Sequence, residues 1–148
     1  MTLLSLKLGR KLKLKELINL YGNGTQIRDW LHVSDHCNAL RKLICHGKLG
    51  ETYNIGGNAE KRNIDVIDII CEILDELYPR KDSRSYKEQI QFVEDRPGHD
   101  KRYAINCNKI MDELDWKQYE SFSTGIKKTI EWYLSNLDWL DDISKKQN

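Results

Sequence analysis

The sequence predicts an α/β protein, and three observations support this fold class. Segments rich in β-branched and aromatic residues, at 30–33, 51–55 and 90–93, alternate with helical patterns along the chain. The strongest helical pattern covers residues 64–77, where apolar residues recur every three or four positions. Only three short strand candidates are present, so we expect a small and incomplete sheet.

The composition indicates one globular domain, or part of a larger one, in 148 residues. Hydrophobic residues make up 39% and charged residues 32%, which is typical of soluble proteins. No apolar run approaches the roughly 18 residues of a membrane-spanning helix, and cations interrupt the apolar residues near Met1, so no signal peptide is predicted. We therefore expect a cytoplasmic protein with no membrane association. The formal net charge of +1 argues against general nucleic-acid binding.

The residues that border the helical patterns predict where helices begin. Ser34 or Asp35 is expected to cap a helix that follows the first strand candidate. Asn63 directly precedes the strongest helical pattern, and asparagine is among the best N-cap residues. Weaker patterns predict helices at 107–114 and 123–136.

The two ends of the chain differ from its middle. Residues 1–20 are rich in leucine and lysine, and their pattern fits a strand or a basic amphipathic helix equally well. Residues 141–148 read as a polar tail. We expect residues 21–140 to form the folded region.

The cysteines and histidines do not predict a metal site. The four cysteines have no CxxC spacing, and Cys71 lies inside an apolar helical pattern, which is typical of a small core residue. His32 and His36 would need one continuous helix to face the same ion, whereas the sequence there favours a strand followed by a helix cap.

The decapeptide EDRPGHDKRY, residues 94–103, combines cations, acids and a histidine around a turn. Pro97 followed by Gly98 is the preferred central pair of a type II turn, which places Arg96 and His99 at its corners. An arginine can pair bidentately with phosphate oxygens, and a histidine can donate to a phosphate or sugar oxygen. The alternative is an exposed turn with weak local ion pairs.

Arg28, in QIRDWL, is the second candidate for anion binding. It could bond Asp29 or Asp35 structurally, or it could hold a diphosphate together with Arg96. Asn63 has a similar double interpretation, because a helix N-terminus is itself favourable for an anion.

Several catalytic and cofactor motifs are missing from the 148 residues. There is no GxGxxG fingerprint, no Tyr-x-x-x-Lys pair and no GxSxG element. The chain therefore offers no obvious acid, base or nucleophile for independent catalysis.

Four stretches together resemble the dTDP-glucose 4,6-dehydratase family of extended short-chain dehydrogenases/reductases, in its carboxy-terminal portion. They are YGNGTQIRDWLHVSDHCNAL, GETYNIGGNAEKRNIDV, DRPGHDKRYAI and GIKKTIEWYLSN. The first two are shared in looser form by related nucleotide-sugar epimerases and decarboxylases. The resemblance implies an incomplete Rossmann sheet with a small substrate-binding subdomain.

This family binds NAD in an amino-terminal Rossmann domain and converts dTDP-glucose to the 4-keto-6-deoxy sugar. The resemblance implies that the NAD site and the catalytic residues are absent from this chain and that a dTDP-sugar is its ligand. Asn19 and Leu20 stand where the family usually has Pro-Ile. The positions that match substrate-contacting residues are Asn19, Leu20, Tyr21, Arg28, Asn63, Asp95, Arg96, Pro97, Gly98 and His99.

We therefore expect a truncated dehydratase that retains the substrate-binding part and is inactive alone. Two alternatives stay open: a non-enzymatic partner of an intact dehydratase, and a fragment of a related epimerase or decarboxylase. A homodimer, or association with an intact homologue, is compatible with each of these interpretations.

Overall fold

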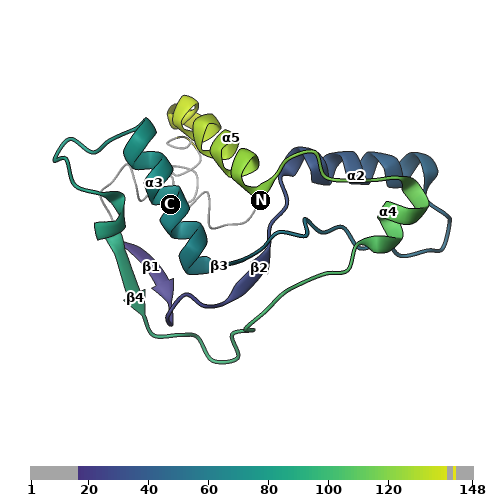
Figure 1. Cartoon of the computed structure of the whole chain (residues 1–148), viewed down its shortest axis with the longest axis horizontal. Helices are drawn as coiled ribbons and strands as arrows, with labels where there is room; N and C mark the ends of the chain where they lie inside the picture. The colour runs from purple at the N-terminus through teal and green to yellow at the C-terminus, as the bar shows by residue number, and fades with distance from the viewer. Residues whose placement is uncertain (1–16, 140–141, 143–148) are drawn as a thin grey trace.

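The computed structural model describes residues 17–139 and residue 142, which form helices packed around two small sheets (Figure 1). In chain order the elements are β1 (Ile18–Tyr21), β2 (Ile27–Asp29), α2 (Val33–His46), β3 (Glu60–Arg62), α3 (Asn63–Leu77), the 3₁₀ turn η1 (Tyr86–Gln89), β4 (Ile90–Val93), α4 (Asn108–Leu114) and α5 (Phe122–Ser135). The predicted α/β class is confirmed. Expectations for residues 1–16, 140–141 and 143–148 lie outside the described residues. Within the described ranges, no helix is both long and apolar enough to cross a bilayer.

β1 and β4 form a parallel pair, although residues 22–89 lie between them in the sequence. Ile18 pairs with Ile90, and Tyr21 pairs with Val93. Residues of β1 alternate between buried and exposed, as expected for a strand with one covered face. Its buried side chains, Ile18 and Leu20, join the main core, so the strand begins before the expected start of the folded region at residue 21.

The main core is built on α3, which lies beside α5 (Figure 1). Val66 and Ile67 of α3 are at most 1% exposed, and Tyr86 from η1 and Ile130 from α5 pack with them. The helix was predicted from its apolar period, and the structure confirms it. Cys71 is part of this core, also as predicted, and burial raises the pKa of its thiol to about 12.

β2 pairs with β3 in an antiparallel sheet, with Ile27 opposite Arg62. The predicted strand at 30–33 was wrong, since β2 ends before it, and the predicted strand at 51–55 is also not a strand. Both predictions followed side-chain character, and both segments do supply apolar side chains to core clusters. A strand additionally needs a neighbouring backbone to pair with, and for residues 27–29 that neighbour is β3.

The start of α2 differs from the prediction. Its N-cap is His32, whose ring nitrogen accepts a hydrogen bond from the N–H of Ser34. Asp35, predicted as a possible cap, is instead 2% exposed. Its carboxylate accepts the N–H groups of Tyr119 and Glu120, so it connects α2 to the segment that leads into α5.

The start of α3 also differs. Its N-cap is Arg62, without a side-chain cap bond, and Asn63 is the first residue of the helix. β3 runs directly into α3, which leaves no separate capping position for Asn63. The N–H of Asn63 donates instead to the carbonyl oxygen of Gln26, at 2.9 Å.

Asp29 holds the glycine-containing loop before β3 in place. Its two carboxylate oxygens accept hydrogen bonds from the N–H groups of Gly57 and Ala59, each at 2.8 Å. A Cβ atom on Gly57 would lie 1.9 Å from the carbonyl oxygen of Trp30. The loop therefore approaches the backbone so closely that only glycine fits there.

We expect Asp29→Asn to lower the free energy of unfolding by about 2 kcal/mol, because an amide offers only one acceptor oxygen and leaves one N–H unpaired. Urea denaturation followed by circular dichroism measures this change. The matched control is Asp112→Asn, whose carboxylate forms no hydrogen bond or ion pair with the described residues. Equal midpoints for the two variants would contradict a structural role for Asp29.

Candidate functional site

The parallel pairing places the carboxyl ends of β1 and β4 at one edge of the sheet. From β4 the chain continues as a connecting arch, residues 94–103, which passes along β2 on its way to α4 (Figure 1). The N–H of Ile27 donates to Lys101 O at 2.8 Å, and the N–H of Tyr103 donates to Ile27 O at 3.0 Å. In open α/β sheets, ligands bind outside the carboxyl ends of the strands. The arch thus borders the region where such a ligand would lie.

The arch contains the predicted type II turn. The N–H of His99 donates to the carbonyl oxygen of Arg96 at 3.2 Å, and Gly98 has a φ of +70°. A positive φ at the third position is the mark of this turn type, and it favours glycine. Pro97 and Gly98 are exposed and form the tip of the turn.

His99 lies between an acid and an arginine. Its Nδ1 is 2.6 Å from Asp95 Oδ1, and its Nε2 is 3.1 Å from a terminal nitrogen of Arg28. The imidazole side chain is only 7% exposed. A guanidinium can donate but not accept, so the Arg28 contact is a hydrogen bond only if Nε2 carries no proton. This geometry selects a neutral ring whose Nδ1–H donates to Asp95.

Asp95 accepts hydrogen bonds from three donors. The N–H of Arg96 and the ring of His99 bond its Oδ1, and the side-chain amide of Gln26 donates to its Oδ2 at 2.7 Å. The hydrogen bond from His99 is the largest of the effects that hold the pKa of Asp95 below its ordinary value. Gly22 packs so close that a Cβ there would lie 2.9 Å from this carboxylate.

Arg28 is held by neutral groups alone. It donates to the carbonyl oxygens of Ile27 and Asp100 as well as to His99, and it lies 4.5 Å over the ring of Tyr103. These bonds use three of its five N–H groups, which leaves two available. Among the described residues, no carboxylate forms an ion pair with Arg28. Its positive charge is therefore positioned but not neutralised.

Two further predicted residues border this cluster. Tyr21, at the end of β1, is 47% exposed and meets His99 edge to face, with ring centroids 6.4 Å apart. Arg96 is exposed, and its guanidinium forms no hydrogen bond or ion pair within the described part of the chain. The structure thus brings together Tyr21, Arg28, Asp95, Arg96 and His99.

The remaining predicted residues are placed differently. The side chain of Leu20 is 4% exposed and belongs to the main core, so only its backbone could meet a ligand. Asn19 is exposed on the other face of β1. Asn63 is linked to the cluster through the backbone of Gln26.

Sequence reasoning did not single out Gln26 or Tyr103. Gln26 directly precedes β2 and lies two positions before Arg28, a spacing that points side chains to the same side of a strand. Tyr103 ends the charged decapeptide and donates from its hydroxyl to the carboxylate of Asp100, which raises the pKa of the phenol. Gln26 donates to Asp95, and the ring of Tyr103 lies under Arg28. A search for charged residues alone overlooks both of them.

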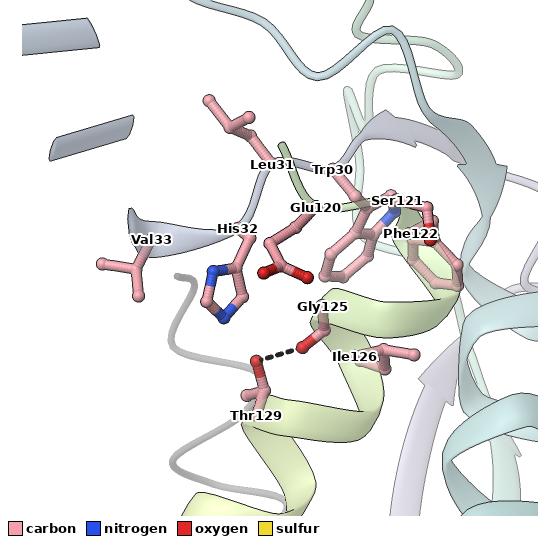
Figure 2. Close-up of a pocket in the computed structure, with 10 residues that line it drawn as sticks. All are labelled: Trp30, Leu31, His32, Val33, Glu120, Ser121, Phe122, Gly125, Ile126 and Thr129. Atoms are coloured by element: carbon pink, nitrogen blue, oxygen red, sulfur yellow. Dashed lines mark hydrogen bonds between the residues drawn. The ribbon is translucent and has the colours of Figure 1, made fainter. Parts of the chain in front are cut away.

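A cavity of about 80 Å³ lies elsewhere, between the start of α2 and the start of α5. Figure 2 shows His32 and Glu120 close to each other at its wall, with Trp30 and Phe122 beside them. None of the predicted substrate-contacting residues lines it. Its walls are mostly apolar, and Lys128 pairs with Glu120 and lowers the pKa of that carboxyl. The cationic cluster around Arg28 is therefore the better candidate for an anionic ligand.

Residues 5–129 match the family model for GDP-mannose 4,6 dehydratase. The chain belongs to this family. Its relatives confirm the resemblance inferred from the four sequence stretches. Over 124 residues it is 56% identical to a dTDP-glucose 4,6-dehydratase of Escherichia coli. The matched region covers 84% of this chain and 34% of that protein. The chain therefore spans about a third of the length of the curated relatives it matches.

Two solved structures share the fold. The dTDP-glucose 4,6-dehydratase of Bacillus anthracis, in complex with NAD, has a TM-score of 0.79 and 39% identity, and the match covers 92% of this chain and 40% of that one. The enzyme DesIV of Streptomyces venezuelae, with NAD bound, has a TM-score of 0.78 and 32% identity, with coverage of 88% and 38%. NAD is thus a ligand of structurally characterised relatives.

We expect the carboxyl group of Asp95 to titrate below pH 3.8, the ordinary value for aspartate. Because its folded pKa is lowered, its hydrogen bonds contribute stability above that pH and lose it as the pH falls through the folded value. In His99→Leu, which removes the first cause of the shift, the pKa should rise. Carboxyl ¹³C shifts followed against pH measure both values. An unchanged pKa in His99→Leu would contradict the observed hydrogen bond.

Proposed function

We propose that this chain is the nucleotide-sugar-binding part of a dTDP-glucose 4,6-dehydratase and that it binds the diphosphate of a dTDP-sugar. The observation that carries the proposal is the Arg28 guanidinium, which is held in place by neutral groups and has no paired acid among the residues that the structure describes. A partly buried charge without a counter-ion is costly to maintain. An incoming diphosphate supplies the missing negative charge.

Arg96 provides the second cation for this ligand. It stands at the corner of the turn, three residues before His99 and on the same arch that contacts Arg28. A diphosphate carries more negative charge than one guanidinium compensates, and arginine pairs with its oxygens bidentately. Tyr21 and Asn63 are proposed to contact the same ligand, as are Asp95, Pro97 and Gly98 at the turn and Asn19 and Leu20 through β1.

The relatives support a dTDP-sugar as the proposed ligand. The 56% identity to a dTDP-glucose 4,6-dehydratase favours a dTDP-sugar over the UDP-sugars of epimerases and decarboxylases. The NAD site is proposed to belong to the part of those relatives that has no counterpart in these 148 residues, since no glycine-rich fingerprint occurs here. The chain alone is then a binding module without turnover.

Titration of the full chain with dTDP-glucose, followed by NMR, tests the proposed binding. We expect saturable binding and a loss of about tenfold to hundredfold in affinity for Arg28→Gln, because a charge-assisted contact is removed. Arg41→Gln is the matched control, since Arg41 is exposed on α2, outside the cluster. UDP-glucose is titrated in parallel and should bind more weakly. Failure of the wild-type chain to bind either sugar nucleotide would refute the proposal.

A second candidate function is association with an intact dehydratase. One face of α2 presents apolar residues at spacings of four, three and four positions, which is typical of a helix that packs against a partner. On this face Val33 and Leu40 are 43% exposed, Ile44 is 86% exposed, and Cys37 is exposed. A family member is the proposed partner, because its chain contains the regions that this one lacks.

If the α2 face binds an intact dehydratase, the chain should co-sediment with the full-length Escherichia coli enzyme. Ile44→Asp should then abolish co-sedimentation, because a carboxylate would be placed in the apolar contact. Leu49→Asp serves as control, since Leu49 is fully exposed but lies beyond α2. Sedimentation of the wild-type chain as a monomer in the presence of the enzyme would exclude this candidate.

A further inference from the structure

The predicted role of His99 was to donate a hydrogen bond to a phosphate or sugar oxygen. In the structure both ring nitrogens already have protein partners: Nδ1 faces Asp95 and Nε2 faces Arg28. The side chain is also 7% exposed, which leaves little surface for a ligand. A role for His99 must therefore act through one of these two partners.

We propose that His99 is a positioning residue that fixes the Arg28 guanidinium for the diphosphate. It does so as the neutral tautomer with the proton on Nδ1, so that Nε2 is free to accept from Arg28. The proposal rests on the proposed function, since it assumes that Arg28 is the group that meets the ligand. It adds to that function a series of hydrogen-bonded side chains that fixes the orientation of the Arg28 guanidinium.

The tautomer is determined by Asp95. A carboxylate beside one ring nitrogen places the proton on that nitrogen and leaves the other as an acceptor. Asp95 is itself fixed, because it accepts from the backbone of Arg96 and the amide of Gln26 in addition to the ring. The chain of contacts therefore runs from Gln26 through Asp95 and His99 to Arg28.

Gln26 is the first member of this chain of contacts, and its orientation has a cost. It is 5% exposed, and its side-chain oxygen has no hydrogen-bond partner among the described residues. A buried acceptor without a partner is unfavourable, and such groups often accompany functional constraints. The amide keeps this orientation because its NH₂ must face the Asp95 carboxylate, which only accepts. Gln26 is thus assigned the task of holding the acid.

The first test reads the tautomer directly, without nucleotide. Long-range ¹H–¹⁵N spectra of the full chain at neutral pH distinguish the Nδ1–H from the Nε2–H form. We expect His99 to be the Nδ1–H form, whereas His32 is an internal reference of the opposite kind, since its Nδ1 accepts from the N–H of Ser34. A protonated His99, or one with its proton on Nε2, would overturn the proposal whether or not dTDP binds.

The second test asks whether His99 acts through Arg28. Asn in place of His99 keeps a donor near Asp95 but does not reach Arg28, whereas Gln extends an acceptor to the position of Nε2. We expect His99→Asn to lower the affinity for dTDP-glucose about tenfold, and His99→Gln to retain most of the wild-type affinity. In an Arg28→Gln background the same changes should have almost no effect, because coupled residues are non-additive.

Full and additive losses from His99→Asn in both backgrounds would overturn the proposal, because they would show direct contact with the ligand. Gln26→Met should lower the affinity for dTDP-glucose several-fold. Gln89→Met, which changes another buried glutamine, should leave that affinity unchanged. Absence of dTDP-glucose binding by the wild-type chain would refute the proposed function, and the tautomer measurement would still test the positioning of His99.

Discussion

The site depends on the parallel pairing of β1 with β4. This pairing joins two strands that are far apart in the sequence and ends both of them at the same edge of the sheet. The arch that leaves β4 can then reach β2, where Ile27 bonds it on both sides through its N–H and its carbonyl oxygen. Without β1 and β4 in register, His99 and Arg28 would belong to unrelated parts of the chain. Core packing of Ile18 and Leu20 against α3 sets that register, because a shift of one residue would turn these side chains to solvent.

Carboxylates fix the loops of this protein in a repeated manner. Asp29, Asp35 and Asp75 each accept two hydrogen bonds from another segment of the chain, and the donors are mainly backbone N–H groups. Asp95 acts locally, since it accepts from the N–H of Arg96 and the imidazole of His99 within the turn of the arch. Acids used in this way do not form ion pairs with Arg28. A chain with nearly equal numbers of cations and acids can therefore still present an arginine whose charge is not compensated.

The sequence predicted those parts of the site that are determined locally. Pro97 and Gly98 specify their turn by their own backbone preferences, and α3 follows from its apolar period. Predictions failed where a partner distant in the sequence decides the outcome. The strand predicted at 30–33 is found at 27–29, because that is where β3 pairs with it. Asn63 is not a cap, because β3 continues directly into α3. That Arg28 and His99 lie together was expected only from the resemblance to a family. The role of Gln26 could not be predicted from the sequence, because it depends on Asp95, which Gln26 contacts only in the folded protein.

The connection between β2 and the arch also bears on how ligand and fold support each other. The arch is joined to β2 by two backbone hydrogen bonds and by the Arg28 side chain, and Arg96 lies on the arch itself. A diphosphate that engages both arginines would link the two segments through its own oxygens. A ligand that binds only the folded chain adds its binding free energy to folding stability. In a chain whose described sheets have only two strands each, that contribution is large relative to what the sheets supply. Ligand binding and the ordering of the arch are then coupled. The hydrogen bonds that connect Gln26 to Arg28 hold the arginine in place before binding and so lower the entropic cost of binding.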